Sequence, residues 1–388
     1  MNNIKLKVLQ ISFKNNFICL LFSFNIFFWG VTVNIIQFRF LIFLLILPIF
    51  LNINQINLIK LFKYSLIPIA LLLHLMLQAS TLNHNHLFSI LGLFLILLIF
   101  DIYKEFFLCN LNKVVYFYLL IFFIFIVVQF FSYDNYREQV SNSCVGCFSI
   151  LRIFYKENSH LALTAPSIIF YLLFISNINK FLNLFIIIFF LFISFTNPSL
   201  TLYLGLTLLI LLTLFFKVKL FKFQNFFFIS IVFFIFLKIF TEPVYKNKVL
   251  DFLSKNNDIN LSTEVYKTSY FVAKNSILHK PLGYGFNNYS EAFNQFSQSF
   301  DVYNKEVFLL NKQDASNNLS KIVTEFGIFS FLFFYFLIIF FSNKKVDIRL
   351  KIFFLLPLLI QTFIRGAGYF NGGFLLFLFY SIYLLLKK

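Results

Sequence analysis

Charged residues are scarce in this sequence. They make up 12% of its 388 residues, whereas hydrophobic residues make up 60% and aromatic residues 22%. So few charges cannot cover a water-soluble domain, which excludes that class and indicates a protein whose solvent is the lipid bilayer. The net charge of +17 would suggest a nucleic-acid partner in a soluble protein, but the lysines cluster between apolar runs. Cytoplasmic loops of membrane proteins explain this clustering better, so no nucleic acid is expected.

Cysteine pairs and acidic clusters are also scarce. The four cysteines include one Cys-x-x-Cys pair, Cys144 and Cys147, and no second pair, so a zinc site is not expected. In an oxidising compartment this pair could form a short-loop disulfide, or it could be two idle thiols. The sequence has no Asp-x-Asp, which a metal-dependent enzyme using nucleotide sugars would need. We expect neither a metal nor a cofactor.

Long apolar runs fill most of the chain. Twelve of them can be placed as crossings of about 30 Å of hydrocarbon, near 17–33, 39–53, 64–79, 87–102, 114–131, 161–178, 181–196, 199–216, 225–241, 319–341, 352–365 and 372–386. The sequence therefore predicts an all-α integral membrane protein with about 12 transmembrane helices, or 10 or 11 if the short runs do not cross. With the N-terminus inside, seventeen Lys and Arg residues flank the inner segments and five lie in the short outer connections. The positive-inside rule then places both termini in the cytoplasm.

Two polar segments interrupt the apolar runs and divide the chain. We expect helices 1–5 over residues 1–131, an outer loop over 132–160, helices 6–9 over 161–241, a large outer loop over 242–317 and helices 10–12 over 318–388. Binding and catalytic residues concentrate on loops that a rigid scaffold positions. The two outer loops are therefore the expected location of a functional site.

Arginine is rare, and its positions are informative. Only five Arg occur among the 32 Lys and Arg residues, and four of them fall on the expected outer side: Arg39, Arg137, Arg152 and Arg365. A guanidinium grips phosphate or carboxylate in two places, whereas Lys would serve nearly as well for snorkelling at the interface. Arg365 also lies among glycines, whose backbone N–H groups suit an anion. We expect functional roles for Arg152 and Arg365.

Polar residues converge just after Arg152, where the chain enters an apolar run. They are Lys156, Glu157 and His160. A carboxylate or imidazole beside cations could accept a hydroxyl proton while the cations hold an anion, as general-base catalysis requires. Alternatively, Ser159 caps the next helix, and Glu157 and His160 are ordinary polar residues at the headgroup level.

The large loop contains an amphipathic helix followed by a glycine turn. Four residues have the spacing of one helical stripe: Tyr266, Tyr270, Ala273 and Ile277. Pro281 should end this helix, and Gly283 and Gly285 then permit a tight turn. The chain re-enters the membrane before Glu325, a carboxylate that is costly in lipid and should face protein or a wet cavity.

The order of these motifs resembles that of the bacterial O-antigen polymerase and ligase superfamily. The similar segments are Thr-Asn-Pro-Ser-Leu-Thr at 196–201, Glu-Asn-Ser-His at 157–160, His-Lys-Pro-Leu-Gly-Tyr-Gly-Phe at 279–286, Ser-Asn-Asn-Leu at 316–319 and Glu-Phe-Gly-Ile at 325–328. The resemblance implies many helices in a bacterial inner membrane and a large periplasmic loop near the C-terminus. Asn317-Asn318 stands where many members, notably the ligases, have His-Asn, which favours the polymerase branch.

What the resemblance implies is transfer of a glycan from an undecaprenyl-pyrophosphate carrier onto a lipid-linked repeat unit, without a metal. Arg152 and Arg365 would stabilise the departing pyrophosphate, and Glu157 or His160 would act as the base. Further substrate contacts are expected from Arg137, Lys156, Lys267, Lys274, His279, Lys280, Asn317, Asn318 and Glu325. The expected partners are the lipid-linked oligosaccharide and the bilayer, and a chain-length regulator is a further candidate.

Two other functions stay open on the sequence. A ligase would transfer finished polymer to the lipid A core, and a flippase or other transporter would move lipid-linked oligosaccharide across the membrane. A transporter should keep its charges within helices around a cavity and its loops short, whereas this chain has a polar outer loop over 242–317. No repeat or mirrored pair of Gly/Pro-broken helices is visible either. The polymerase is therefore the favoured reading.

Overall fold

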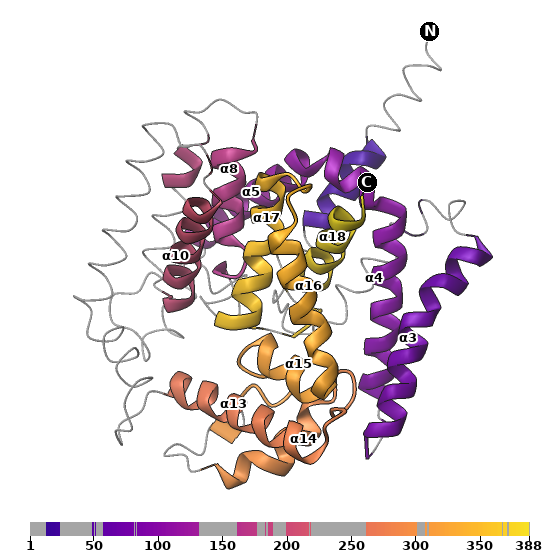
Figure 1. Cartoon of the computed structure of the whole chain (residues 1–388). Coiled ribbons are helices and arrows are strands. Elements are labelled where there is room, and N and C mark those ends of the chain that lie inside the picture. Colours follow the sequence, from indigo (N-terminus) through magenta and orange to yellow (C-terminus); the bar gives the residue numbers. More distant parts are fainter. Residues whose placement is uncertain are drawn as a thin grey trace.

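The part of the chain that the structure describes is helical. The computed structural model describes residues 13–23, 49, 51, 57–80, 82, 84–131, 161–176, 183, 185–188, 199–216, 218, 261–300, 307–308, 310–366, 368–370 and 372–387 (Figure 1). Within these ranges every regular element is a helix and no strand occurs. The all-α class predicted from the sequence is confirmed for them. The outer loop 132–160 and the predicted run 225–241 lie outside the described residues.

A bundle of apolar helices forms the larger part of the fold. Its members are α3 (Leu58–Gln78), α4 (His84–Cys109), α5 (Leu111–Phe131), α8 (Ala165–Phe174), α10 (Leu200–Phe215), α16 (Ser330–Ser342), α17 (Ile348–Leu359) and α18 (Phe374–Leu386). Helix α17 is central: it contacts α8, α10, α16 and α18, and residues 352–356 have no exposed area. A helix that is apolar all round is stable only when surrounded in this way or by lipid.

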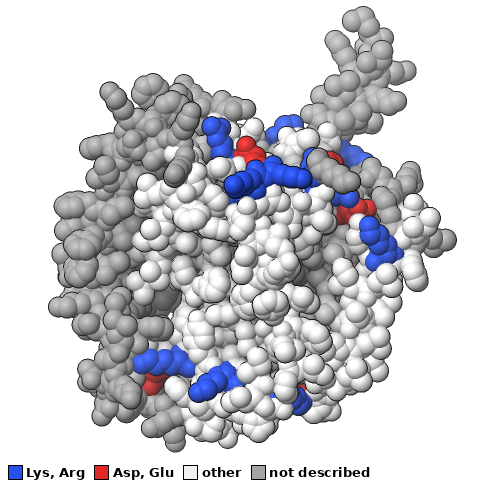
Figure 2. Space-filling model, in the orientation of Figure 1, with Lys and Arg blue, Asp and Glu red and all other residues white. Residues whose placement is uncertain are grey.

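Several of these helices suit a membrane. Leu61–Gln78, His84–Cys109 and Asn318–Ser342 are long and apolar enough to cross one, and four shorter apolar segments accompany them: Leu111–Ile124, Ala165–Phe174, Leu200–Phe215 and Phe374–Leu386. Figure 2 shows the charged side chains of the described residues gathered near two opposite ends of this face, with an uncharged belt between. These features indicate a membrane-embedded protein. The number of twelve crossings stays a prediction.

Chain direction places several cations at one end of the bundle. Helix α4 runs away from the loop helices toward Lys104, and α16 runs the same way toward Lys344 and Lys345 (Figure 1). At that end Lys387 pairs with Glu105 at 3.0 Å. The predicted inner cations of these helices thus share the end opposite the large loop, although which end faces the cytoplasm stays a prediction.

A smaller layer lies across the other end of the bundle. It consists of α13 (Leu261–His279), α14 (Tyr289–Phe296) and the short η2 (Ser297–Ser299), beneath α15 (Asn318–Phe326) (Figure 1). The helix predicted before Pro281 is therefore present. Its buried face agrees with the predicted stripe only in part. Ala273 is buried as predicted, but Tyr270 is 37% exposed, and the buried face also contains Thr268, Ser269 and Ser276. The three buried hydroxyls bond to carbonyl groups of their own helix, which makes that face compatible with burial.

Two predicted membrane helices are broken in the structure. The run 319–341 is divided into α15, the 3-10 turn η4 (Gly327–Phe329) and α16. The run 352–365 begins as α17 and ends in a π-helix, η5 (Ile360–Ile364), whose C-terminal cap is Arg365. A π-helix is rare and frequently occurs at functional sites. Both breaks lie near the loop layer.

Candidate functional site

Three segments meet where α13 lies across the start of α15. Asn317 caps α15, since its Oδ1 accepts the Ser320 N–H at 2.9 Å. The Nδ2 of Asn317 donates to the Tyr270 hydroxyl of α13 at 3.0 Å. The Ser316 N–H donates to Ser269 Oγ, also of α13, at 3.1 Å. Hydrogen bonds therefore hold α13 to the first turn of α15.

The turn that carries Arg365 rests on the same place. The Gly366 N–H donates to the Ser316 carbonyl at 3.0 Å. A Cβ on Gly366 would lie 2.5 Å from the Asn318 N and 2.6 Å from its Oδ1, so only glycine allows this approach. Burial raises the pKa of the Tyr266 hydroxyl on α13, and the Arg365 guanidinium opposes that rise. Arg365 and Tyr266 therefore share one environment at this junction.

Asn318 is an unusual residue beside this turn. It is fully buried, yet neither its Nδ2 nor its Oδ1 has a hydrogen-bond partner within the described ranges. The hydroxyl groups of Ser316 and Ser320 are in the same condition. Unsatisfied buried polar groups are uncommon in native proteins and cost free energy. Several of them lie at one helix start, against the turn that carries Arg365, and they mark a polar site rather than ordinary packing.

An ion pair between a buried lysine and a partly exposed aspartate lies against the Arg365 turn. Lys321 Nζ, fully buried on α15, lies 2.8 Å from Asp314 Oδ1 and donates to the Gln313 carbonyl at 2.8 Å. Asp314 in turn reaches the Arg365 turn, because a Cβ on Gly368 would lie 2.4 Å from the Asp314 Oδ1. Lys321 thus fixes a carboxylate against the segment that holds Arg365.

Glu325 faces protein, as its position in a membrane helix required. It is fully buried, and its two oxygens accept the N–H groups of Asn287 at 2.8 Å and Tyr289 at 3.1 Å. Its Oε1 is also 3.8 Å from Lys321 Nζ. Glu325 has no exposed area and holds the loop before α14, while its predicted contact with substrate stays a prediction.

The two glycine motifs form one structural unit. The Gly285 N–H donates to the Glu325 carbonyl at 2.9 Å, and the Ile328 N–H donates to the Pro281 carbonyl at 2.8 Å. Gly283 has φ +87°, and a Cβ there would lie 2.3 Å from the Glu325 carbonyl oxygen. Only glycine meets both conditions. The motifs His-Lys-Pro-Leu-Gly-Tyr-Gly-Phe and Glu-Phe-Gly-Ile therefore dock the loop onto the membrane helix.

Lys280 also has a docking role. Its Nζ donates to the Gln78 carbonyl at the end of α3 at 2.8 Å and to Glu291 at 3.1 Å, and it lies 4.4 Å from the centroid of the Tyr284 ring. The Ser80 N–H donates to the same Glu291 carboxylate at 3.0 Å. Lys280 thus ties the loop to the α3–α4 connection, away from Arg365.

The other predicted site residues are dispersed. Lys267 is half-buried on α13, directly after Tyr266 in the chain. Lys274 and His279 are exposed farther along α13, and the His279 ring contacts Phe296 at 5.0 Å between centroids. Of the predicted residues, the structure brings together Arg365, Asn317 and Asn318. The sequence reading missed Ser269 and Lys321 here, although the spacing of Lys321 and Glu325 was a usable signal.

The second predicted cluster lies outside the described residues. It comprises Arg137, Arg152, Lys156, Glu157 and His160, and the Cys144 and Cys147 pair also lies outside the described residues. No group of three or more His, Cys, Asp or Glu that could hold a metal occurs in the described ranges.

No protein-family model, curated protein or solved structure matches this chain. The resemblance to polymerases and ligases therefore rests on the motifs themselves. In the structure, the motifs at 279–286, 316–319 and 325–328 all lie at the contact of the loop layer with α15.

Proposed function

We propose that this chain is a membrane glycosyltransferase that moves a glycan from a polyprenyl-pyrophosphate carrier onto a lipid-linked acceptor, in the manner of an O-antigen polymerase. The observation that carries the proposal is the Arg365 turn. Its backbone is hydrogen-bonded to the polar start of α15, where Asn318 has unsatisfied buried polar atoms, and the Arg365 charge acts on the Tyr266 hydroxyl of α13.

The position of this junction suits a substrate with a lipid anchor. It lies where the apolar bundle ends and the loop layer begins, so a polyprenyl tail could stay in the bilayer while its pyrophosphate reaches Arg365 (Figure 1). A soluble nucleotide sugar would gain nothing from this placement. The bacterial inner membrane and a periplasmic loop layer belong to the same proposal.

The reaction needs two groups from the protein, namely a base and a cation that stabilises the departing pyrophosphate. The acceptor hydroxyl forms a bond to the anomeric carbon and gives its proton to a base, while the bond from that carbon to the pyrophosphate oxygen breaks. Negative charge grows on the departing pyrophosphate, and a fixed guanidinium stabilises it in two places. Arg365 is assigned that role, with Arg152 as its partner, and Glu157 or His160 is proposed as the base.

Replacing Arg365 by Lys tests the proposal. The variant keeps the charge but loses the planar fork, so we expect activity to fall more than about tenfold, or ~1.4 kcal/mol of transition-state stabilisation. The readout is polymer formed by the purified protein from a synthetic polyprenyl-pyrophosphate oligosaccharide. Arg349→Lys is the matched control, since Arg349 is exposed at the start of α17, at the other end of that helix.

Three results would contradict the proposal. If the Arg365→Lys variant forms a near-normal amount of polymer, Arg365 only extends its charge to the membrane interface, where Lys serves nearly as well. In a deletion strain, loss of long chains with one repeat unit still on the acceptor fits a polymerase, whereas accumulation of lipid-linked polymer would indicate a ligase. Wild-type protein that transfers no sugar, but exchanges lipid-linked oligosaccharide between the leaflets of vesicles into which it is reconstituted, would indicate a flippase.

A further inference from the structure

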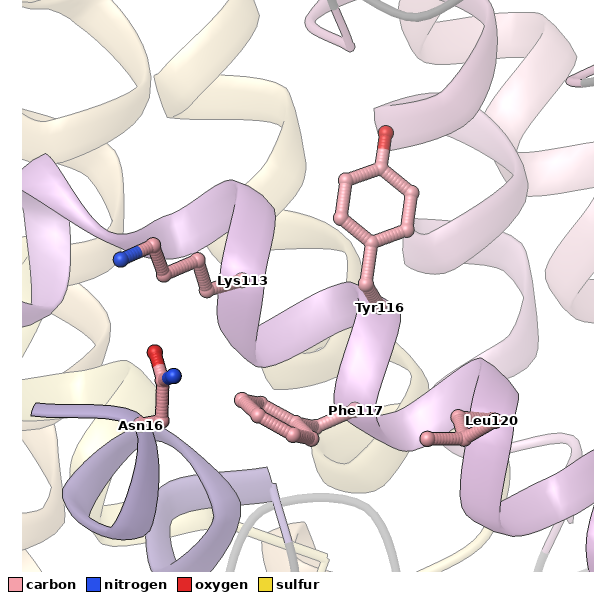
Figure 3. A pocket seen from close by; sticks show the side chains of 5 residues that line it. All are labelled: Asn16, Lys113, Tyr116, Phe117 and Leu120. Atoms are coloured by element: carbon pink, nitrogen blue, oxygen red, sulfur yellow. The ribbon is translucent and has the colours of Figure 1, made fainter. Parts of the chain in front are cut away.

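A recess lies at the end of the bundle opposite α13. It has a volume of about 400 Å³ and is lined by Asn16, Lys113, Tyr116, Phe117 and Leu120 (Figure 3). Asn16 belongs to the helical segment 13–23, and the other four belong to the first turns of α5. A recess of this size accommodates a small ligand or the headgroup of a lipid with part of one chain.

The lining residues change in character along α5. The lining residues of α5 recur every three or four positions, so they share one face of the helix. They are Lys113, Tyr116, Phe117 and Leu120. In Figure 3 the Lys113 and Asn16 side chains lie on the same side of the recess, whereas Phe117 and Leu120 follow one another along α5. Beyond Leu120 the exposed residues Phe123 and Ile124 continue in the apolar part of the helix. The recess is therefore polar at the helix start and apolar farther along.

Lys113 differs from Lys104 and Lys387, two other cations near this end. Lys104 pairs with Asp101 at 2.7 Å, and Lys387 pairs with Glu105 at 3.0 Å. Lys113 is exposed and forms no ion pair with any residue in the described ranges. A cation without a carboxylate partner, at the mouth of a recess with an apolar far side, complements a ligand with an anionic head and an apolar chain.

We propose that this recess binds one anionic phospholipid from the leaflet opposite the loop layer. Its phosphate lies at Lys113 and the Asn16 amide, and one acyl chain follows Phe117 and Leu120. Basic recesses between membrane helices bind anionic headgroups in this way. A soluble anion would not use the apolar side, and a zwitterionic lipid would not supply the net negative charge that Lys113 complements. The proposal is independent of the glycosyltransferase reaction.

Photocrosslinking tests this proposal on the full-length protein. The probe is phosphatidylglycerol with a diazirine in one acyl chain, in mixed micelles, and labelled peptides are located by mass spectrometry. We expect labelling of the 111–124 segment, and a fall of about fivefold in Lys113→Gln, the loss that removing one lysine beside an anionic lipid typically produces. Lys113→Arg keeps the positive charge, so its labelling should equal that of the wild type. Lys104→Gln is the matched control, because Lys104 already has a carboxylate partner, and its labelling should equal that of the wild type.

Three outcomes would overturn the proposal. Equal labelling of wild-type protein by the corresponding phosphatidylcholine probe would show that charge plays no part. Unchanged labelling in Lys113→Gln would remove Lys113 from the site. Loss of labelling on addition of millimolar inorganic phosphate would show a small-anion site instead of a lipid site. The first and third comparisons use wild-type protein, so they do not depend on the folding of any variant.

Discussion

Lys321 shows how much of this site depends on single buried residues. Its side chain has no exposed area, and its charge lies 2.8 Å from Asp314 and 3.8 Å from Glu325. Through Asp314 it supports the Arg365 turn, and through Glu325 it meets the loop before α14. One lysine therefore links three segments that are distant in the sequence.

Removing Lys321 should destabilise the protein strongly. Lys321→Met leaves the Asp314 and Glu325 carboxylates without their cation. Because the Asp314 side chain is 44% exposed, we expect a loss of about 2 kcal/mol, below the ~3–5 kcal/mol of a fully buried pair. Denaturant unfolding of the detergent-solubilised protein measures this loss. Lys274→Met, on the exposed face of α13, is the control and should change stability by less than about 0.5 kcal/mol. Equal stability of the two variants would contradict the role given to Lys321.

The sequence predicted part of this residue network. Glu325 was recognisable as buried because a carboxylate within a membrane helix must face protein, and Lys321 lies one turn before it. The contacts of Asp314 and Asn318 could not be predicted, since they depend on how the turn at 366–368 approaches α15. Arg365 was identified by its glycine neighbours, whereas its proximity to Tyr266 required the structure.

At the scale of elements, helix existence was easier to predict than helix continuity. The ends of α4, α5, α10 and α18 lie within several residues of the apolar runs that predicted them. Hydropathy does not detect backbone breaks, so the division at Gly327, where φ is +53°, and the π-helix before Arg365 were missed. Much of the buried face of α13 was missed for a related reason. A stripe search favours Tyr and Ile, while this helix buries Ser and Thr that bond to their own backbone.

The contact between the loop layer and the α3–α4 connection should weaken in acid. Although burial alone would raise the pKa of Glu291, hydrogen bonds from Asn288, the Ser80 N–H and Lys280 lower it below its ordinary value of 4.5. A depressed folded-state pKa gives stability that is complete above the unfolded value and is lost as pH falls through the folded value. The contact is therefore expected to be intact at neutral pH and to loosen in acid.

The variant Glu291→Gln checks this pH dependence. It should unfold more easily than wild type by roughly 1 kcal/mol at pH 7. The difference should shrink as the pH falls through the depressed pKa of the folded-state carboxyl and vanish once that carboxyl is protonated. Hydrogen exchange at Gln78 to Ser80 reports the contact directly. Glu105→Gln is the control, because its ion pair with Lys387 is exposed at the opposite end. A difference between wild type and Glu291→Gln that persists in acid would refute the assignment.

The whole molecule has two charged ends and an uncharged belt on the face in Figure 2. The loop layer lies at one end, and the α16–α17 turn with the C-terminal end of α18 lies at the other (Figure 1). Lipid accounts for this arrangement, because charges avoid the hydrocarbon and cations remain on the cytoplasmic side. It follows that α13 and the α16–α17 turn should face opposite sides of the membrane.

Single cysteines at exposed positions decide this topology. In a variant whose four native cysteines are replaced by Ser, Lys274→Cys on α13 should react with a membrane-impermeant thiol reagent in intact cells. Lys345→Cys, in the turn between α16 and α17, should react only after permeabilisation. Both positions are exposed, so differences in burial cannot produce the contrast. Labelling of Lys345→Cys but not of Lys274→Cys in intact cells would invert the topology. The proposed site would then lie on the cytoplasmic side, where nucleotide sugars are available, and the case for a polyprenyl-pyrophosphate donor would fail.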